Sequence, residues 1–275
     1  MTTVQLIRAA LAEDIGRADI TSQLLIPAGQ LAVGYIRARM SGTLAGINIC
    51  RAVFKTVDRR IRFQPRLRDG GQFRKGTVLA VVSGPARSLL AAERTALNFL
   101  QHLSGIATLT RKFVNAVAGT GAVILDTRKT TPGWRTLEKF AVRCGGGQNH
   151  RHRLDAMMLI KDNHIAVAGS VTAAIARARQ SGRPFEIEVR TLAQVREALR
   201  AGARHIMLDN MSLAQLRQAV RLARGQARLE ASGRITLRRV RAVALTGVDD
   251  ISVGAITHSA PAVDIGLDFV LKPWP

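Results

Sequence analysis

The sequence predicts an α/β protein whose second half is a parallel sheet with crossover helices. Three segments align without gaps: TLAQVREA from Thr191, SLAQLRQA from Ser212 and TLRRVRAV from Thr236. Each opens on a residue type preferred at helix N-caps and continues with helical apolar spacing. Eighteen residues after each cap, an apolar run reaches Asp209, Glu230 and Gly254. This recurrence is typical of βα repeats.

The same pattern extends upstream of the repeat. AVILDTRK (122–129), MMLIKDNH (157–164) and FEIEV (185–189) read as buried strands, with a helix near 170–181, so that 122–256 holds six candidate strands. Parallel strands with crossover helices form either a barrel or a doubly wound sheet. The turn after the first strand, DTRKTTPG, is not the GxGxxG expected of a doubly wound sheet, which favours a barrel.

The first hundred residues have a different organisation, and we expect an α+β domain there. A helix at about 3–13 and a DITS cap precede strand-like LAVGYIRAR and GTLAGI, a helix around RAVFKTVD, and RIRFQPRL and TVLAVVSG flanking a DGGQFRKG turn. A long helix from Ala86 to about Gly119 follows, with SGIAT (104–108) as a candidate break. The alternating VDIGLDFVL (263–271) predicts a strand that returns to the first domain. We therefore expect domains at 1–105, with 262–275 added, and at 106–261.

Composition bounds the class of protein. The chain has 275 residues, 47% of them hydrophobic, and no apolar run approaching a membrane span. Its two cysteines, Cys50 and Cys144, lie far apart and favour a reducing cytoplasm over a disulfide framework. The net charge is +22, and 34 of the 41 basic residues are arginines. That excess suits an acidic small molecule or nucleic acid, but aromatics are only 4% and stacking platforms are missing, so we expect neither nucleic acid nor a membrane as the partner.

Charged residues gather where the predicted strands end. Arg128 and Lys129 follow the first strand, Lys161 the second, and Arg151 lies in the preceding GGGQNHR loop. Barrel sites form at these ends, and like charges about 4 Å apart repel by roughly 4 kcal/mol at an effective dielectric near 20. The pattern therefore indicates a pocket for a polyanionic ligand. The alternative is that each cation pairs with a nearby acid or points into solvent.

Three further features suit such a pocket. Glu188 and Asp209, at neighbouring strand ends, could hold Mg²⁺ or stabilise developing positive charge, or could pair with local cations. The turns Ser232–Gly233 and Ser252–Gly254 could cradle a phosphate through backbone N–H groups. Arg94 shares a helical face with Leu90 and Leu97, which indicates snorkelling, or a role in a site or subunit interface.

These motifs, in order, resemble the quinolinate phosphoribosyltransferase family. The resemblance runs from about Asp14 to Ser259 through ERTALNFLQHLSGIAT, DTRKTTPG, EKFAVRCGGGQNHR, LIKDNH, EIEV, IMLDN, EASG and ISVGAITHS. It implies an N-terminal α/β sandwich domain, an incomplete seven-stranded α/β barrel of TIM type, and a homodimer with shared active sites, with a hexamer as a further alternative. The implied reaction joins quinolinate to phosphoribosyl pyrophosphate and gives nicotinate mononucleotide, pyrophosphate and CO₂, in NAD biosynthesis.

The resemblance also implies roles for individual residues. The quinolinate carboxylates would be held by Arg94 from the neighbouring subunit and by Arg128, His150, Arg151 and Lys161. Phosphoribosyl pyrophosphate would contact Thr127, Lys129, Glu188, Asp209, Ser232, Gly233, Arg234, Ser252, Val253, Gly254 and His258. Mg²⁺ would lie on Glu188 and Asp209, and the catalytic set would be Lys129, Lys161, Glu188 and Asp209.

Four positions depart from the family pattern. The family usually has glycine where this chain has Arg153 and Arg234, aspartate where it has Ala156, and leucine where it has Trp134. Arg234 bears most directly on the site, because it could crowd the phosphate turn or add a contact. Two alternatives to the enzyme remain: a ModD-like paralogue associated with molybdenum transport, with another acceptor, and a basic nucleic-acid-binding protein. The retained NHR and KDNH segments favour quinolinate as the acceptor.

Overall fold

The computed structural model describes residues 2–270 and divides the chain into two compact units. Among the described residues, unit 1 comprises 2–109, 131–146 and 260–270, and unit 2 comprises 110–130 and 147–259. Within residues 2–270, no helix is both long and apolar enough to span a membrane.

Unit 1 is built on an antiparallel four-stranded sheet in the order β12-β1-β5-β3. The strands are β1 (Leu31–Ala38), β3 (Arg62–Pro65), β5 (Val78–Pro85) and β12 (Ile265–Val270), and a small second sheet pairs β2 (Gly42–Thr43) with β4 (Gln72–Phe73). The predicted C-terminal strand is confirmed, since β12 pairs along β1; Leu271, the last residue of that prediction, lies outside the described residues.

Helices α1 (Thr3–Ile15), α2 (Ile20–Leu25) and α3 (Ile47–Val57) belong to the same unit. Asp19 caps α2 by accepting the Ser22 N–H at 3.0 Å, as the DITS segment predicts. The apolar face of α3 packs on the sheet, where Phe54 and Phe63 lie 6.0 Å apart between ring centroids. Helix α5 (Arg135–Cys144), which the sequence reading did not include, completes this unit.

Helix α4 (Ala86–Ala116) runs for 31 residues without interruption, so the expected break at 104–108 is wrong. Gly105 serves close packing instead of a bend. A Cβ atom at this position would collide with the carbonyl oxygen of Pro261, so only glycine allows the two backbones to approach.

Unit 2 is a parallel βα array. Its six-stranded sheet has the order β6-β11-β10-β9-β8-β7, and every pairing is parallel. The strands are β6 (Val123–Leu125), β7 (Met158–Ile160), β8 (Phe185–Val189), β9 (His205–Asp209), β10 (Arg228–Ser232) and β11 (Asp250–Ser252). These are the six strands that the apolar runs predict.

The resemblance implies seven strands in this array, but the described residues form six. On the side of β6 away from β11, residues 2–270 form only an isolated parallel bridge between Leu125 and Gln148. The surrounding GGGQNHRHR segment is rich in glycine and charge, a composition that disfavours a strand. The array is thus an incomplete barrel, open between β6 and β7.

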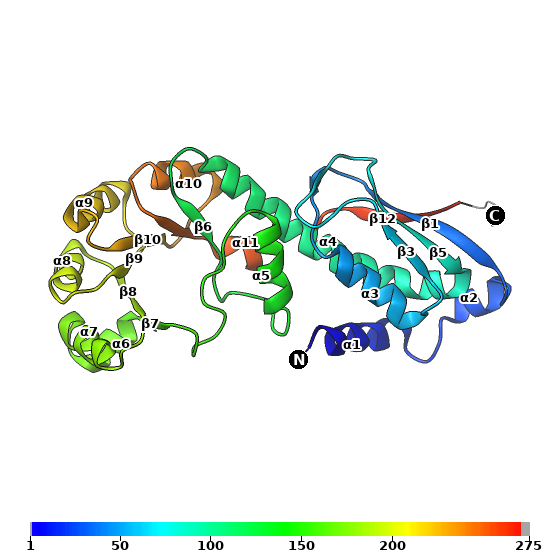
Figure 1. The fold of residues 1–275 in the computed structure, drawn as a ribbon, viewed down its shortest axis with the longest axis horizontal. Coiled ribbons are helices and arrows are strands. Elements are labelled where there is room, and N and C mark those ends of the chain that lie inside the picture. Colours follow the sequence, from blue (N-terminus) through cyan, green and yellow to red (C-terminus); the bar gives the residue numbers. More distant parts are fainter. Residues whose placement is uncertain (1, 271–275) are drawn as a thin grey trace. The chain divides into compact units, whose positions relative to one another are not determined.

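Helices follow the strands of this array. They are α6 (Asp162–Ala168), α7 (Val171–Gln180), α8 (Leu192–Arg200), α9 (Leu213–Ala223), α10 (Leu237–Ala244) and α11 (Ala255–His258). Of these, α7, α8, α9 and α10 lie on its outer side (Figure 1). Of the three repeat caps, Thr191 and Ser212 accept backbone N–H groups at 3.2 and 3.3 Å, whereas Thr236 makes no side-chain cap bond.

Candidate active site

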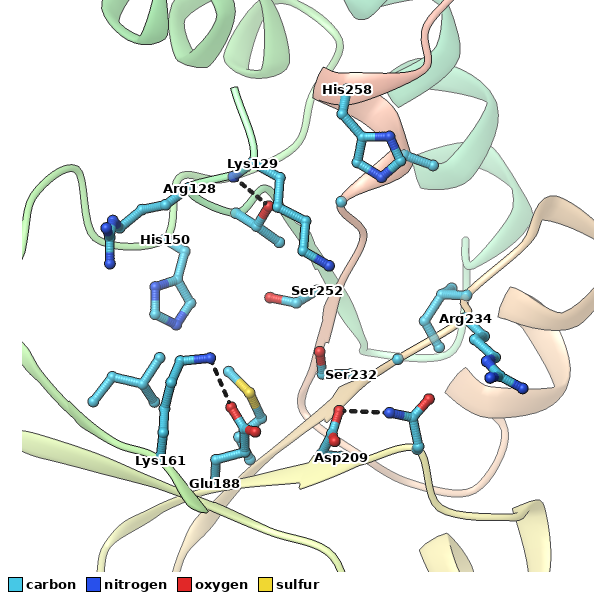
Figure 2. Close-up of a pocket in the computed structure, with 18 of the residues that line it drawn as sticks. Arg128, Lys129, His150, Lys161, Glu188, Asp209, Ser232, Arg234, Ser252 and His258 are labelled. Carbon is cyan, nitrogen blue, oxygen red and sulfur yellow. Dashed lines mark hydrogen bonds and ion pairs between the residues drawn. The ribbon is translucent and has the colours of Figure 1, made fainter. Parts of the chain in front are cut away.

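One pocket of about 720 Å³ lies where the strands of unit 2 end (Figure 2). Most of the residues singled out in the sequence line it together: Thr127, Arg128, Lys129, His150, Arg151, Lys161, Glu188, Asp209, Ser232, Gly233, Arg234, Ser252, Gly254 and His258. Two are not among its lining residues. Val253 is buried, and Arg94 has an exposed side chain on α4 in unit 1.

Cations occupy one side of the pocket. Arg128 and Lys129 follow β6, and Arg151 follows the Gln148 bridge. Burial, and then the neighbouring charge of Arg128, lowers the pKa of Arg151. The Arg151 guanidinium is oriented by a 2.9 Å bond from Nη1 to the Met157 carbonyl oxygen. Two neighbouring guanidinium groups favour binding of an anion between them.

Carboxylates occupy the facing side, as Figure 2 shows. Lys161 Nζ lies 3.0 Å from Glu188 Oε2. Asp209 accepts a 3.0 Å bond from the Asn210 amide and lies 3.3 Å from Arg190 Nε. Lys161 and Glu188 therefore pair with each other, which is the alternative that the sequence left open for such charges. Arg190, which also lies 2.9 Å from Asp162, was not predicted.

The same two carboxylates suit a magnesium ion chemically. Glu188 ends β8 and Asp209 ends the neighbouring β9, and both line the pocket with side chains only 10% and 14% exposed. Carboxylate oxygens are the ligands Mg²⁺ takes when it also binds substrate phosphates. A cation here would compete with Lys161 and Arg190 for these oxygens.

The turn after β10 comes very close to the turn after β9. Gly233 has φ of 95°, and a Cβ atom there would collide with the Asn210 side chain, so glycine is required. Arg234 follows with φ of 50°, a left-handed conformation that is strained for arginine. Its exposed side chain also lines the pocket.

Lys129 and Gly254 also lie close together in this part of the pocket. A Cβ atom at Gly254 would be 3.1 Å from Lys129 Cδ. Thr257 holds the Lys129 backbone by donating a 2.7 Å bond to its carbonyl oxygen.

Asp126 is a supporting residue that the sequence did not single out. It is fully buried at the end of β6, and its two oxygens accept the Asn149 amide at 2.6 Å and the His150 backbone N–H at 2.9 Å. One carboxylate thus attaches the 149–151 loop to the strand that leads to Arg128.

A buried polar cluster lies behind His150. His150 Nε2 is 2.9 Å from Glu186 Oε2 and 3.5 Å from Glu230 Oε2, and both glutamates are fully buried. Burial, reinforced by the charge of Glu186, raises the pKa of Glu230 to about 8. The sequence did offer a signal for Glu186, because residues two apart in a strand share a face, which places it on the same side as Glu188.

The fold and the pocket define a barrel enzyme for anionic substrates, and comparison with known proteins identifies the family. Residues 19–104 match the N-terminal domain and residues 106–268 the C-terminal domain of quinolinate phosphoribosyl transferase. The chain belongs to this family, which confirms the resemblance seen in the sequence.

Individual relatives match over nearly their whole length. The chain is 44% identical over 272 residues to the nicotinate-nucleotide pyrophosphorylase [carboxylating] of Mycobacterium leprae, covering 95% of each chain. It is 43% identical over 263 residues to the probable enzyme of the same name from Bacillus subtilis, covering 94% of this chain and 91% of that one. The crystal structure of NadC from Streptococcus pyogenes superposes with a TM-score of 0.93 at 41% identity, covering 98% and 99%.

Proposed function

We propose that this protein transfers the phosphoribosyl group of phosphoribosyl pyrophosphate to quinolinate, with decarboxylation, and so makes nicotinate mononucleotide for NAD synthesis. The observation that carries the proposal is one pocket lined by Arg128, Arg151, Glu188 and Asp209, together with Lys161, which is paired with Glu188. Family membership and the names of relatives about 40% identical support the same activity.

The acceptor site that we propose is the cationic side of the pocket. Arg128 and Arg151 present planar guanidinium groups, which bind planar carboxylates through paired hydrogen bonds. Lys161 adds a third cation from the end of β7. We also propose a homodimer, in which Arg94 of the second subunit adds a fourth cation. A hexamer would be a further assembly of such dimers. A dicarboxylate neutralises more of this charge than a monocarboxylate, which favours quinolinate over nicotinate.

The donor site that we propose is the remainder of the pocket. The residues after β10 and β11, including Ser232, Gly233, Arg234, Ser252, Gly254 and His258, and the buried Val253 beneath them, would surround the 5′-phosphate. Lys129 and Thr127 would bind the pyrophosphate, and Glu188 and Asp209 would hold Mg²⁺, which would supply positive charge to the leaving pyrophosphate.

The reaction follows from this arrangement of charge. Departure of pyrophosphate leaves positive charge at the anomeric carbon, which the Glu188 and Asp209 carboxylates stabilise and the pyridine nitrogen attacks. The positive charge of the resulting pyridinium nitrogen stabilises the electron pair left on the adjacent ring carbon when its carboxylate leaves as CO₂, and a proton from solvent then binds to that carbon. Lys161, which is paired with Glu188, would exchange that contact for the substrate carboxylate.

The direct test supplies purified protein with phosphoribosyl pyrophosphate, Mg²⁺ and either quinolinate or nicotinate. We expect nicotinate mononucleotide and CO₂ from quinolinate, and little product from nicotinate. Product from nicotinate alone would overturn the acceptor. Tight duplex DNA binding that falls steeply with salt, without turnover, would instead favour a nucleic-acid-binding protein.

The compartment that we propose is the cytoplasm, because both cysteines are thiols, one of them buried.

A further inference from the structure

The imidazole ring of His150 makes a hydrogen bond at each of its nitrogen atoms. On one side Nδ1 lies 2.8 Å from the backbone nitrogen of Arg151, which carries a hydrogen and is the donor. On the other side Nε2 lies 2.9 Å from Glu186 Oε2. The side chain is only 9% exposed, although His150 is one of the residues that line the pocket.

These two contacts fix the tautomer of the ring. A backbone N–H can only donate, so Nδ1 accepts and carries no hydrogen. The ring hydrogen is then on Nε2, where a carboxylate oxygen accepts it. An imidazolium would point an Nδ1–H directly at the Arg151 N–H and would lose this hydrogen bond.

Three acidic side chains hold His150 in place. Glu186 and Glu230 approach Nε2 from β8 and β10, and both are fully buried. Asp126 fixes the His150 backbone from β6, through the 2.9 Å bond to its N–H. His150 is therefore attached through its ring to β8 and β10, and through its backbone to the residue that follows β6.

The hydrogen bond at Nδ1 also positions the next residue, Arg151. Arg151 is bonded at its backbone nitrogen by His150 and at its guanidinium by the Met157 carbonyl oxygen, 2.9 Å away. Loss of the ring would leave the Arg151 N–H without this acceptor and loosen the backbone that carries the guanidinium toward the pocket.

We infer that His150 is a positioning residue and not a ligand of a substrate carboxylate. It stays neutral, holds Arg151 for the anionic substrate, and lines the pocket with a ring whose two nitrogens are both bonded to the protein. The inference rests on the proposed function for the identity of that substrate, but not for the protonation state of the ring.

The first test reads the ring directly. In the full-length protein with ¹⁵N-labelled histidine at about pH 7, the NMR signals of His150, assigned by their loss in His150→Phe, should show a neutral ring protonated at Nε2. The same pattern should persist when quinolinate is added to saturation. An imidazolium, or an Nδ1–H tautomer, with quinolinate bound would overturn the inference.

The second test separates positioning from direct binding through quinolinate affinity measured by calorimetry. His150→Phe keeps an aromatic ring but removes both nitrogens, and we expect binding about tenfold weaker. His150→Asn places a side-chain oxygen near the Nδ1 position, and should restore most of that loss although it carries no charge.

A double-mutant cycle completes the design. In an Arg151→Ala background, His150→Phe should change quinolinate affinity by less than about twofold, because its effect passes through Arg151. Equal, independent losses in both backgrounds, with no rescue by His150→Asn, would show that His150 contacts the carboxylate itself. If wild-type protein does not bind quinolinate, the proposed function fails, while the NMR result still decides the state of the ring.

Discussion

Arg234 has an unfavourable backbone conformation at the edge of the pocket. Its φ of 50° is one of three positive values among the described non-glycine residues, with Asn210 and Arg224. Strain of this kind costs roughly 1 kcal/mol and tends to persist where the side chain has a function. We interpret Arg234 as an added cation for the phosphates of the donor substrate.

Replacing Arg234 with glycine should therefore have two opposite effects. Arg234→Gly relieves the left-handed strain, and we expect about 0.5 to 1 kcal/mol greater stability in urea denaturation. The same change removes a cation and should raise the KM for phosphoribosyl pyrophosphate about five- to tenfold.

The control for this prediction is Arg224→Gly. Arg224 ends α9 with φ of 42° and does not line the active-site pocket. The Arg224→Gly substitution should stabilise the protein by a similar amount and leave the KM for phosphoribosyl pyrophosphate unchanged. An unchanged KM in Arg234→Gly would remove Arg234 from the donor site.

Glu230 makes stability depend on pH in a definite direction. Its pKa is raised to about 8 in the folded protein, mainly by burial, whereas an unfolded glutamate titrates near its ordinary value of 4.5. Between these values the folded state holds one more proton than the unfolded state, so stability falls as pH rises. The contribution is full below about pH 4.5 and is lost through about pH 8.

The test compares urea denaturation of wild type and Glu230→Gln at several pH values. The amide is neutral throughout, so the stability of wild type relative to the variant should decline between about pH 5 and 8. Glu13→Gln, at an exposed position on α1, is the control, and its free energy of unfolding should depend on pH as that of wild type does. A constant difference between wild type and Glu230→Gln would indicate that Glu230 does not titrate in this range.

Residue-level prediction from the sequence succeeded where a side chain follows a strand. Arg128, Lys161, Glu188 and Asp209 were located because carboxyl ends of parallel strands meet at one edge. Asp126, Glu186 and Arg190 were missed. The partners of a buried or surface charge come from segments distant in sequence, and neither their direction nor their distance is encoded locally.

At the scale of elements, apolar runs and caps predicted the six parallel strands and the C-terminal strand β12. Two short helices were not predicted. Helix α6 has seven residues and buries none of them, so it has no apolar face to recognise. Helix α5 does have one, with Leu137, Ala141 and Val142 buried, but its ten residues include several charged ones and were not recognised. Gly105 was misread for another reason. A glycine within a helical pattern indicates either a bend or a close approach, and only the position of Pro261 decides between them.

Gly105→Ala is the corresponding element-level prediction. The added methyl would overlap the Pro261 carbonyl oxygen, and we expect a loss of about 2 to 3 kcal/mol in the free energy of unfolding. Gly29→Ala is the matched control, because a Cβ there has no atom within 4 Å and no positive φ. A loss below about 0.5 kcal/mol in Gly105→Ala would contradict the close-packing role.

At the scale of the whole molecule, the proposed dimer makes each active site depend on two chains. Arg94→Ala and Lys161→Ala should each be nearly inactive. In randomly reassembled dimers of both variants, half are mixed and each mixed dimer has one intact site, so activity should recover to about a quarter of wild type.

The control mixture is Arg128→Ala with Lys161→Ala. Both residues line one pocket of unit 2, so no mixed dimer of this pair contains an intact site. Recovery in this control, or none in the first mixture, would rule out a site shared through Arg94.

Most of the arginine excess lies away from the pocket, and nothing in the structure explains why arginine is used there in place of lysine.

The central claim is that cations from separate loops jointly bind a small dicarboxylate, and calorimetric titration of quinolinate tests it most directly. Arg128→Ala should weaken binding about ten- to a hundredfold relative to wild type, because a charge-assisted contact is lost. Arg217→Ala, on the exposed face of α9, should bind as wild type does. Equal affinity of Arg128→Ala and wild type would contradict the account.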